Sequence, residues 1–431
     1  MAIDNKDKKV LKSSIEREQN EVACSAECEK IKGSKNLNVP HLRFPEFSGE
    51  WKMATFGDIA KGFDYGMNAA AKSFDGNNKY IRITDIDEVS SQYLYDDVVS
   101  PDGELEDRYL VKENDILLAR TGASTGKSYL YRNSDGKLYF AGFLIRANIY
   151  KHNSYFVFSQ LHTLRYKKWI SVMSARSGQP GINSQEYASF PVYTTSLQEE
   201  DKIATFLKLL DERIITQNKI IERYESLIRG IMVELQKQGL KRGTWKKVFL
   251  NDILKERNER NSNLYQVFSV SVSQGIINQV DHLGRSFSAK DTSKYNVVHY
   301  GDLVYTKSPT GSFPYGIVKQ SLNHESVAVS PLYGVYVPDS LAIGIYLHKY
   351  FMSEINTQNY LHPLIQKGAK NTINITNQRF LENRVPMPLD SNELLLISKL
   401  LRSLNDEIRH EQNMLQEYQK QKQYLLRQMF I

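Results

Sequence analysis

Residues 119–131, ARTGASTGKSYLY, come close to a phosphate-binding motif. A P-loop has the pattern G-x-x-x-x-G-K-[ST], in which backbone N–H groups and a lysine hold nucleotide phosphates. Here only three residues separate Gly122 from Gly126, although Lys-Ser follows directly. A P-loop also needs a helix after the Lys-Ser pair, whereas SYLYRN (128–133) has the composition of a strand. A nucleotide-binding enzyme is therefore the alternative interpretation of this loop, not the favoured one.

A loop in the C-terminal half, TKSPTGSFPYG (306–316), has no Gly-Lys-Ser but shares a simpler pattern with the first. In both, a predicted strand ends in a cation, a hydroxyl residue follows, and a turn rich in glycine and hydroxyl groups comes next. Such groups hold DNA phosphates, and glycine lets the backbone approach a ligand closely. The alternative is a tight turn whose hydroxyls satisfy only its own hydrogen bonds. The predicted DNA-contacting residues are Arg120, Thr121, Ser124, Lys127, Lys307, Ser308, Thr310 and Ser312.

A second pair of loops, SARSGQPGINSQ (174–185) and QKGAKNTINITN (366–377), offers cations and amides. Each precedes a predicted strand that contains proline. Arginine or lysine with guanine, and asparagine or glutamine with adenine, are the usual major-groove pairings. A polar surface loop without a ligand is the alternative. The residues predicted here to contact DNA are Arg176, Gln179, Asn183, Lys370 and Asn371.

An internal repeat places these loops in two similar frames. Trp51-Lys52 recurs as Trp245-Lys246, 194 positions later (245 − 51), and Asp58-Ile59 recurs as Asp252-Ile253 at the same offset. The offset returns near the end of each half, but the middles align differently: ENDILLARTG (113–122) resembles YGDLVYTKSP at an offset of 187 (302 − 115). Similar frames with different contents are what we expect if each half reads a different target.

Each half is predicted to contain a mixed α/β globular part followed by a long helix. The globular parts carry short β-rich runs at Ile116–Ala119, Leu303–Thr306 and Tyr333–Val337. The helices have apolar residues at heptad spacing, which favours packing of one helix on the other. The alternative is that each amphipathic helix packs only on its own domain. The predicted seam residues are Ile203, Leu207, Leu210, Ile214, Ile221, Ile228, Ile397, Leu401, Leu404, Ile408 and Leu415.

Composition limits the class of protein. The chain has 431 residues, 41% of them hydrophobic, which allows two or three folded domains. No apolar run approaches the roughly 18 residues of a membrane span, and MAIDNKDKKVLKSS lacks the apolar core of a secretory signal. A net charge of +7 permits a polyanionic partner without requiring one. We therefore expect a cytoplasmic protein with no membrane partner.

Motifs of catalysis and metal binding are missing from the sequence. The nine histidines show no H-E-x-x-H spacing, and there is no G-x-S-x-G, dinucleotide fingerprint or Asn/Asp-Pro-Pro-aromatic tetrapeptide. Cys24 and Cys28 read as ordinary thiols in a reducing compartment rather than as metal ligands. We predict that the chain is not an enzyme and binds no metal.

Over about residues 38–431 the chain resembles the specificity subunit of Type I restriction–modification systems. VPHLRFPEFSGEWKMATFGDIAKG (39–62) is similar to the opening of that family's first recognition domain. LVKENDILLARTGASTGKS (110–128) is similar to its mid-domain strand and loop, and SLQEEDKIATFLKLLDERI (196–214) to the start of its first spacer helix. Residues 1–38 depart from the family, and we interpret them as a flexible, charged extension.

The resemblance implies an α+β fold with two target-recognition domains, 39–195 and 241–390. Two long helices, 196–240 and 391–431, would form an antiparallel coiled coil in a pseudo-two-fold repeat. It implies a non-catalytic reader of a split, asymmetric site in double-stranded DNA. Two modification subunits, which methylate adenine, and restriction subunits would be its partners. S-adenosylmethionine, ATP and Mg²⁺ are expected on those partners, and no cofactor is expected on this chain. A coiled-coil scaffold without DNA specificity is the other alternative.

Overall fold

The computed structural model describes residues 38–175, 179–280, 291–367 and 373–431. The predicted N-terminal extension, with Cys24 and Cys28, lies outside the described residues except for Asn38, so its character stays a prediction. The chain divides into two units, one of residues up to 212 together with 418–431, and the other of residues 213–417. The predicted domain limits stay predictions.

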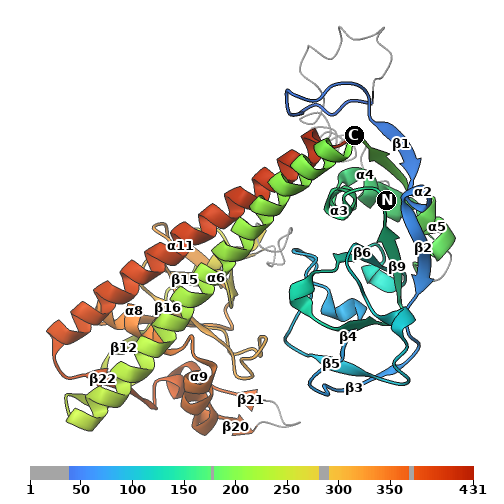
Figure 1. The fold of residues 1–431 in the computed structure, drawn as a ribbon. Helices are drawn as coiled ribbons and strands as arrows, with labels where there is room; N and C mark the ends of the chain where they lie inside the picture. The colour runs from blue at the N-terminus through green and yellow to red at the C-terminus, as the bar shows by residue number, and fades with distance from the viewer. Residues whose placement is uncertain (1–37, 176–178, 281–290, 368–372) are drawn as a thin grey trace, which may run out of the picture. The chain divides into compact units, whose positions relative to one another are not determined.

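The first unit is built around a four-stranded antiparallel sheet of order β2-β9-β6-β7. These strands are β2 (Ala60–Tyr65), β9 (Leu144–Ile149), β6 (Asp115–Ala119) and β7 (Ser128–Leu130). Strand β6, DILLA, is buried throughout, as its nearly unbroken apolar run predicts for an inner strand. Around the sheet lie β1 (Lys52–Thr55), α2 (Phe56–Ile59), β3 (Ala70–Ser73), β4 (Lys79–Ile81), β5 (Val99–Asp102), β8 (Leu138–Phe140), α3 (Ser154–Gln160), α4 (Leu164–Met173), α5 (Ser184–Ala188) and β10 (Pro191–Thr194) (Figure 1).

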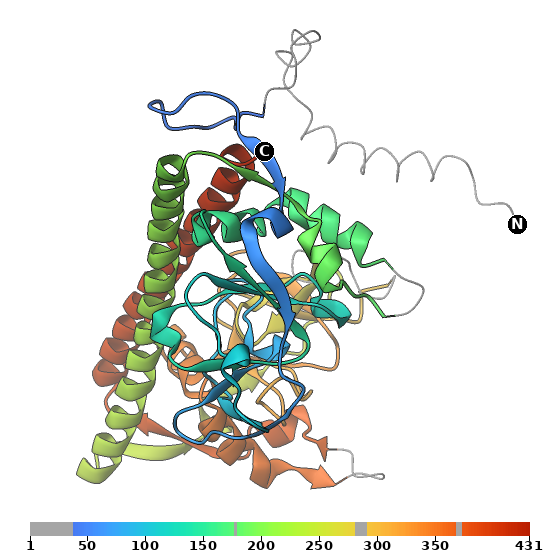
Figure 2. The ribbon, with the colours of Figure 1, turned by 45° about the vertical axis from the view of Figure 1, so that its right-hand side comes forward.

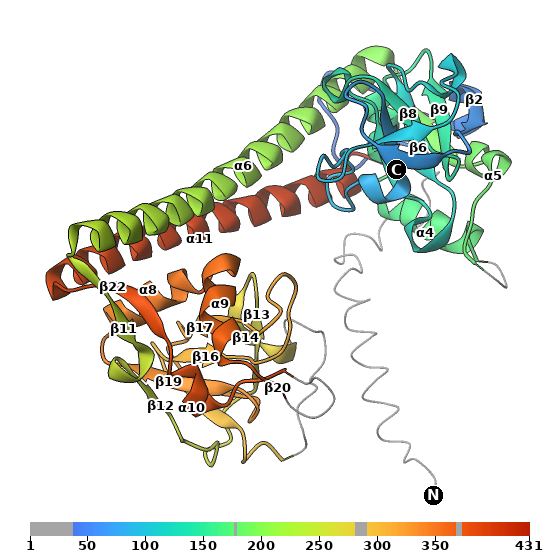
Figure 3. The same cartoon turned by 90° about the horizontal axis from the view of Figure 1, so that it is seen from below.

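The second unit repeats this sheet with the order β12-β19-β16-β17. Its strands are β12 (Leu254–Glu256), β19 (Gly334–Pro338), β16 (Leu303–Tyr305) and β17 (Val318–Gln320), and helix α8 packs beside them (Figure 3). The strands predicted near 116, 303 and 333 are thus confirmed as β6, β16 and β19. The other elements are β11 (Trp245–Phe249), β13 (Phe268–Ser271), β14 (Gly275–Asn278), β15 (Asn296–Val298), β18 (Val327–Val329), α8 (Leu341–Tyr350), α9 (Glu354–Leu361), β20 (Gln366–Lys367), β21 (Ile373–Asn374), α10 (Asn377–Phe380) and β22 (Arg384–Pro388).

The same turn leads into the inner strand of both sheets. Asn114 has a φ of 67° and Gly301 a φ of 93°, a left-handed conformation that asparagine and glycine adopt most readily. The next residue closes the turn with its carboxylate: Asp115 accepts from the backbone N–H of Lys112 at 2.8 Å, and Asp302 from that of His299 at 2.8 Å. The sequence match at an offset of 187 therefore corresponds to a backbone turn that both domains share.

A buried tryptophan opens each globular part. The Trp51 indole N–H donates to Glu199 at 3.3 Å, and the Trp245 indole N–H donates to Glu393 at 2.8 Å. Each glutamate lies in the first turn of the long helix that follows the domain. The strand after each tryptophan pairs with the strand before that helix, β1 with β10 and β11 with β22. Both ends of each domain are therefore anchored at the start of its helix.

The two long helices are α6 (Leu197–Arg242) and α11 (Ser391–Gln428), with 46 and 38 residues, or about 69 and 57 Å. In the second unit Gln217 donates to the backbone oxygen of Glu411 at 3.1 Å, while Trp245, just after α6, meets Glu393 at the start of α11. The helices are therefore antiparallel there (Figure 1). Gln217 and Glu411 are 194 residues apart, which is the repeat offset, so equivalent positions of the two halves meet.

The first unit contains the opposite ends of the same helices. Asp211 of α6 and Lys422 of α11 form an ion pair at 2.6 Å. The end of α11 also meets the segment before β1, since the Leu42 N–H donates to the Gln428 oxygen at 2.8 Å (Figure 2). Trp51 packs edge-to-face on Phe430, with ring centroids 6.1 Å apart.

The predicted apolar seam is used in two ways at once. Ile221 and Ile228 belong to one buried cluster with Leu401 and Ile408, as mutual packing of the helices requires, but the same cluster includes Tyr346 of α8. Mutual packing of the helices is therefore confirmed in this unit, where the seam also packs on the second domain, and the alternative that each helix packs only on its own domain is wrong here. The buried seam residues are Ile203, Leu207, Leu210, Ile221, Ile228, Ile397, Leu401 and Ile408; Ile214, Leu404 and Leu415 are half-buried.

Candidate nucleic-acid interface

The loop in residues 119–131, whose sequence comes close to a P-loop, is a short turn between two strands. After β6, Gly122–Ser124 form one 3-10 turn, Gly126 has a φ of 93°, and strand β7 begins at Ser128. The predicted strand after Lys127 is confirmed, and the helix that would hold a nucleotide phosphate is not there. The loop geometry therefore argues against the nucleotide-binding alternative.

The second predicted loop of this domain lies against the first. Thr121 forms a β-bridge with Gly181, and the Gly122 N–H donates to the Pro180 oxygen at 2.9 Å. A Cβ atom on Gly122 would lie 3.3 Å from the Gln179 side-chain nitrogen. The structure thus brings Gln179 next to Arg120 and Thr121, from which it is 59 and 58 positions away in sequence (179 − 120 and 179 − 121). Arg176 lies outside the described residues.

Arg120 follows directly after strand β6 and contacts an aromatic ring. Its guanidinium lies over the Tyr65 ring, 4.9 Å from the centroid, a favourable cation–π distance. The Tyr65 hydroxyl accepts from the Ser184 backbone N–H at 3.2 Å. The hydrogen bond from Ser184, and to a smaller extent the charge of Arg120, lower the pKa of the Tyr65 phenol. Within the described part of the chain Arg120 forms no ion pair with a carboxylate, so its charge is available to a ligand.

Two of the predicted contact residues already have structural partners. The Lys127 ammonium lies 3.0 Å from a Glu88 carboxylate oxygen and 3.4 Å from the Ile86 carbonyl. Asn183 caps helix α5, its side-chain oxygen accepting from the Glu186 N–H at 2.9 Å. Ser124 is half-buried, and its carbonyl accepts from the Lys127 N–H at 3.0 Å. For these residues a role in DNA binding stays a prediction.

The corresponding loop of the second domain is built differently. Lys307 has a φ of 61°, and burial lowers the pKa of its ammonium while the charge of Glu256 acts the other way. The Glu256 carboxylate also accepts from the Asn377 side-chain amide at 2.6 Å. Where the first domain sets an arginine against an aromatic ring, the second sets a lysine near an acid–amide pair.

The remaining predicted residues of this loop lie near its tip. Ser308 is exposed, and its carbonyl accepts from the Thr310 hydroxyl at 3.1 Å. Thr310 and Phe313 exchange backbone hydrogen bonds, and the Ser312 hydroxyl donates to Glu354. Lys370 and Asn371 lie outside the described residues. The predicted role of all these residues in contacting DNA stays a prediction.

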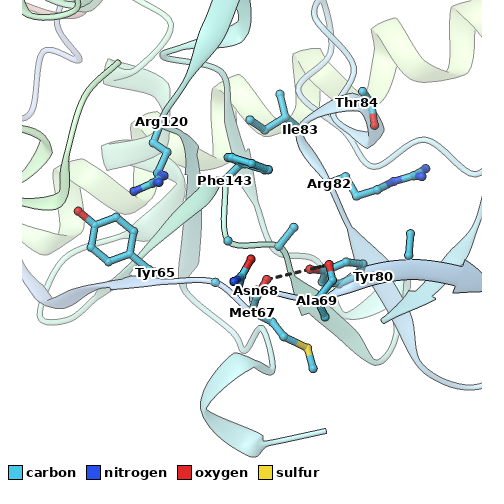
Figure 4. Close-up of a pocket in the computed structure, with 14 residues that line it drawn as sticks. Tyr65, Met67, Asn68, Ala69, Tyr80, Arg82, Ile83, Thr84, Arg120 and Phe143 are labelled. Atoms are coloured by element: carbon cyan, nitrogen blue, oxygen red, sulfur yellow. Dashed lines mark hydrogen bonds between the residues drawn. The ribbon is translucent and has the colours of Figure 1, made fainter. Parts of the chain in front are cut away.

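Sequence reasoning missed a pocket beside Arg120. It has a volume of about 590 Å³, and Tyr65, Asn68, Arg82 and Phe143 are among its lining residues (Figure 4). Phe143 lies between Arg120 and Arg82 in this view and is 60% exposed. These residues come from loops and strand ends scattered over about 80 positions, so no local pattern could have assembled them.

No group of three or more His, Cys, Asp or Glu side chains in the described ranges could hold a metal ion. Among those residues, no helix has the length and apolar character that a membrane span requires.

Known proteins share this architecture. Residues 48–225 match the family model of the Type I restriction modification DNA specificity domain. The MjaVIII specificity subunit of a Type I restriction enzyme from Methanocaldococcus jannaschii is 24% identical over 215 residues. This match covers 48% of the chain and 46% of that relative, so it spans about half the length of the relative.

The similarity in structure covers more of the chain. The crystal structure of a Type I restriction–modification S subunit from M. genitalium superposes with a TM-score of 0.59 at 13% identity, covering 91% of this chain and 99% of that one. At this identity the superposition speaks for the fold, and the sequence match speaks for the recognition domain. Residues 48–225 are therefore similar to the Type I restriction modification DNA specificity domain, and the repeated domain-and-helix fold is similar to that of a Type I restriction–modification S subunit.

Proposed function

We propose that this chain reads a two-part, asymmetric sequence in double-stranded DNA for a Type I restriction–modification complex. Each globular domain reads one half of the site, and the antiparallel helices set the gap between the halves. Two modification subunits, carrying S-adenosylmethionine, dock on the chain, and restriction subunits that use ATP and Mg²⁺ join them. The chain itself supplies recognition and no catalysis.

One observation carries this proposal: the two domains share a frame and differ at the loops. Their sheets have the same strand order, and the same Asp-closed turn precedes the inner strand. At the end of that strand, however, the first domain presents Arg120 over Tyr65, and the second presents Lys307 near Glu256. If the two domains recognise different base sequences, we expect different side chains at equivalent positions of a shared fold, because base contacts specify the sequence.

The direct test is to co-express the chain with its modification subunits and map methylated adenines across the host genome. We expect a single motif with two defined parts separated by a fixed number of unspecified bases. If the complex assembles but methylates without sequence preference, the chain is a scaffold and the proposal fails. Turnover of ATP or S-adenosylmethionine by the purified chain alone would contradict the non-catalytic role.

A separate experiment tests whether the length of the two helices sets the gap between the half-sites. Removing residues 214–220 and 408–414 deletes one heptad from each helix and keeps the apolar seam in phase to within about 20°. The deletion removes Gln217 and Glu411 together, so neither loses its partner alone. Seven residues correspond to about 10 Å of helix, so the gap should shrink by about 3 base pairs. An assembled variant that keeps the original gap would show that the helices do not set it.

A further inference from the structure

Phe143 is an exposed aromatic residue on a fixed backbone. It follows Ala141 and Gly142 in the turn between β8 and β9 and is 60% exposed. The Gly142 N–H donates to the Met67 oxygen at 2.8 Å, and the Leu144 N–H to the Ala141 oxygen at 2.8 Å. The Phe143 carbonyl accepts from the Arg120 N–H at 3.1 Å. A single exposed ring is common on proteins, but this one is held by hydrogen bonds beside a cation and a pocket.

The backbone under this turn is packed as closely as glycine allows. A Cβ atom on Gly66 would lie 2.2 Å from the Ala141 oxygen, so β2 and the turn approach each other without intervening side chains. The turn therefore has little freedom to carry Phe143 away from Arg120. A backbone fixed in this way loses little conformational entropy when the turn binds a ligand.

The pocket beside Phe143 combines apolar lining residues with Arg120, which forms no ion pair with a carboxylate of the described residues. Met67, Ala69 and Tyr80 are among its lining residues, and the Tyr80 hydroxyl donates to the backbone oxygens of Met67 and Ala69 at 2.8 and 3.1 Å (Figure 4). Arg82 is held by Asp85 at 2.7 Å and Asp97 at 2.9 Å. Arg120 has no carboxylate partner among the described residues. A matching ligand presents an apolar group next to hydrogen-bond acceptors.

The major-groove edge of DNA has this chemistry where thymine lies next to a purine. The thymine C5-methyl group is apolar, whereas guanine O6 and N7 accept hydrogen bonds from arginine. A phosphate fits less well, because an apolar wall gives a charged group no compensation for lost water.

From this geometry we propose that Phe143 determines specificity by contacting the methyl group of a thymine in the half-site of the first domain, while Arg120 donates to acceptors of a neighbouring base pair. This inference rests on the proposed function and adds to it a residue, a base and a chemical group. It also predicts that the first half-site contains a thymine adjacent to a guanine on one strand or the other.

The test uses the complex with its modification subunits, once the motif is mapped. Each thymine of the first half-site is replaced singly by deoxyuridine, which removes only the methyl group, and binding is measured at fixed salt. One replacement should weaken binding by wild type about fourfold, as expected for loss of one buried methyl contact. Phe143→Ala should be insensitive to that replacement, and Phe143→Leu should keep part of the sensitivity.

Phe74→Ala is the matched control, since Phe74 is a 40% exposed phenylalanine of the same domain that does not line the pocket. It should respond to deoxyuridine as wild type does. The inference is overturned if no thymine position responds in wild type, or if Phe143→Ala responds in full. A half-site without an adjacent thymine and guanine also overturns it. Absence of any sequence preference in wild type is a different result, because it contradicts the proposed function itself.

Discussion

Strand β7 of the first domain and strand β17 of the second occupy the same place beside their inner strands, yet their middle residues differ. Tyr129 pairs with Leu117, and Lys319 pairs with Val304 in the same register. Tyr129 is fully buried and donates to Asp135 at 2.5 Å. Lys319 is 5% exposed and has no hydrogen-bond partner within the described ranges. The backbone pairing is thus common to both domains, whereas the side chains that fill it are free to diverge.

The same contrast holds at the surface. The turn at Asp115 and Asp302 is equivalent in its hydrogen bonds, but the loop that ends each inner strand is not. Positions that shape the turn before the inner strand are shared, and the residues at the end of that strand, which we propose contact DNA, differ. This division suggests which substitutions should act alike in the two domains and which should act differently.

The largest expected effect is one in which the domains behave alike. Trp51→Ala and Trp245→Ala each remove a buried indole that is hydrogen-bonded to a helix glutamate, so each should destabilise its own unit by about 4 kcal/mol. Hydrogen exchange resolved by peptide should show lost protection in the altered unit. Trp169→Ala, at a half-buried position in the first domain, should cost less. Equal loss of protection in both units after a single substitution would contradict separate frames.

The next effect should have opposite signs in the two domains. Lys319→Met removes a buried, unpaired cation and should stabilise the second unit by about 2 kcal/mol near neutral pH. Tyr129→Phe leaves the buried Asp135 carboxylate with one donor fewer and should destabilise the first unit by about 1–2 kcal/mol. Urea unfolding of the two variants measures both changes in the free energy of unfolding. Destabilisation by Lys319→Met would contradict the interpretation of Lys319 as a buried, unpaired cation.

Lys319 also predicts a pH dependence. Burial lowers the pKa of its ammonium from 10.5 to about 8, so the cost of the buried charge is fully present below pH 8. Between pH 8 and 10.5 the unfolded chain binds more protons than the folded one, and stability should rise with pH. The rise should be smaller in Lys319→Met, because Lys349, whose pKa burial also lowers to about 8, and Lys307, whose pKa burial also lowers, still contribute. An identical pH profile for both proteins would place Lys319 in a more polar environment.

The smallest expected effect distinguishes the two loops that we propose contact DNA. Arg120→Gln and Lys307→Gln should each weaken DNA binding by about 1 kcal/mol and relax the sequence preference of one half-site only. Lys127→Ala should lower the salt slope of binding by roughly one unit if Lys127 contacts a phosphate. If its pairing with Glu88 is its whole role, the slope should not change. Methylation mapping and salt titration of the three variants distinguish these cases.

The parts of the fold that could be predicted are those encoded by local periodicity or by the repeat. The strand at 116–119 is a continuous apolar run, and the heptad rows of α6 and α11 are long enough to define a buried face. The Asp-closed turns could be aligned because asparagine and glycine both suit the required φ. These features depend on neighbours in sequence, so the sequence alone indicates them.

The parts that could not be predicted depend on tertiary proximity. Glu88 neutralises Lys127 from a loop 39 positions away (127 − 88), and Tyr65 reaches Arg120 from strand β2. Phe143 looks in sequence like one more strand residue, although it lies in the turn between β8 and β9 and is 60% exposed. The apolar seam of the helices gave no sign that Ile228 also packs on the second domain. Residue type and spacing could identify the candidate loops. They could not show which side chains of those loops form ion pairs or hydrogen bonds within the protein.

The central claim is that the two domains read DNA independently, and exchanging one of them tests it most directly. Residues 39–195 are replaced by the corresponding domain of a relative with a different motif, and the methylated adenines of a host carrying the chimeric complex are mapped. We predict that the first half-site changes to that of the donor, while the second half-site and the gap between them stay the same. A motif altered in both halves, or in neither, would contradict the claim.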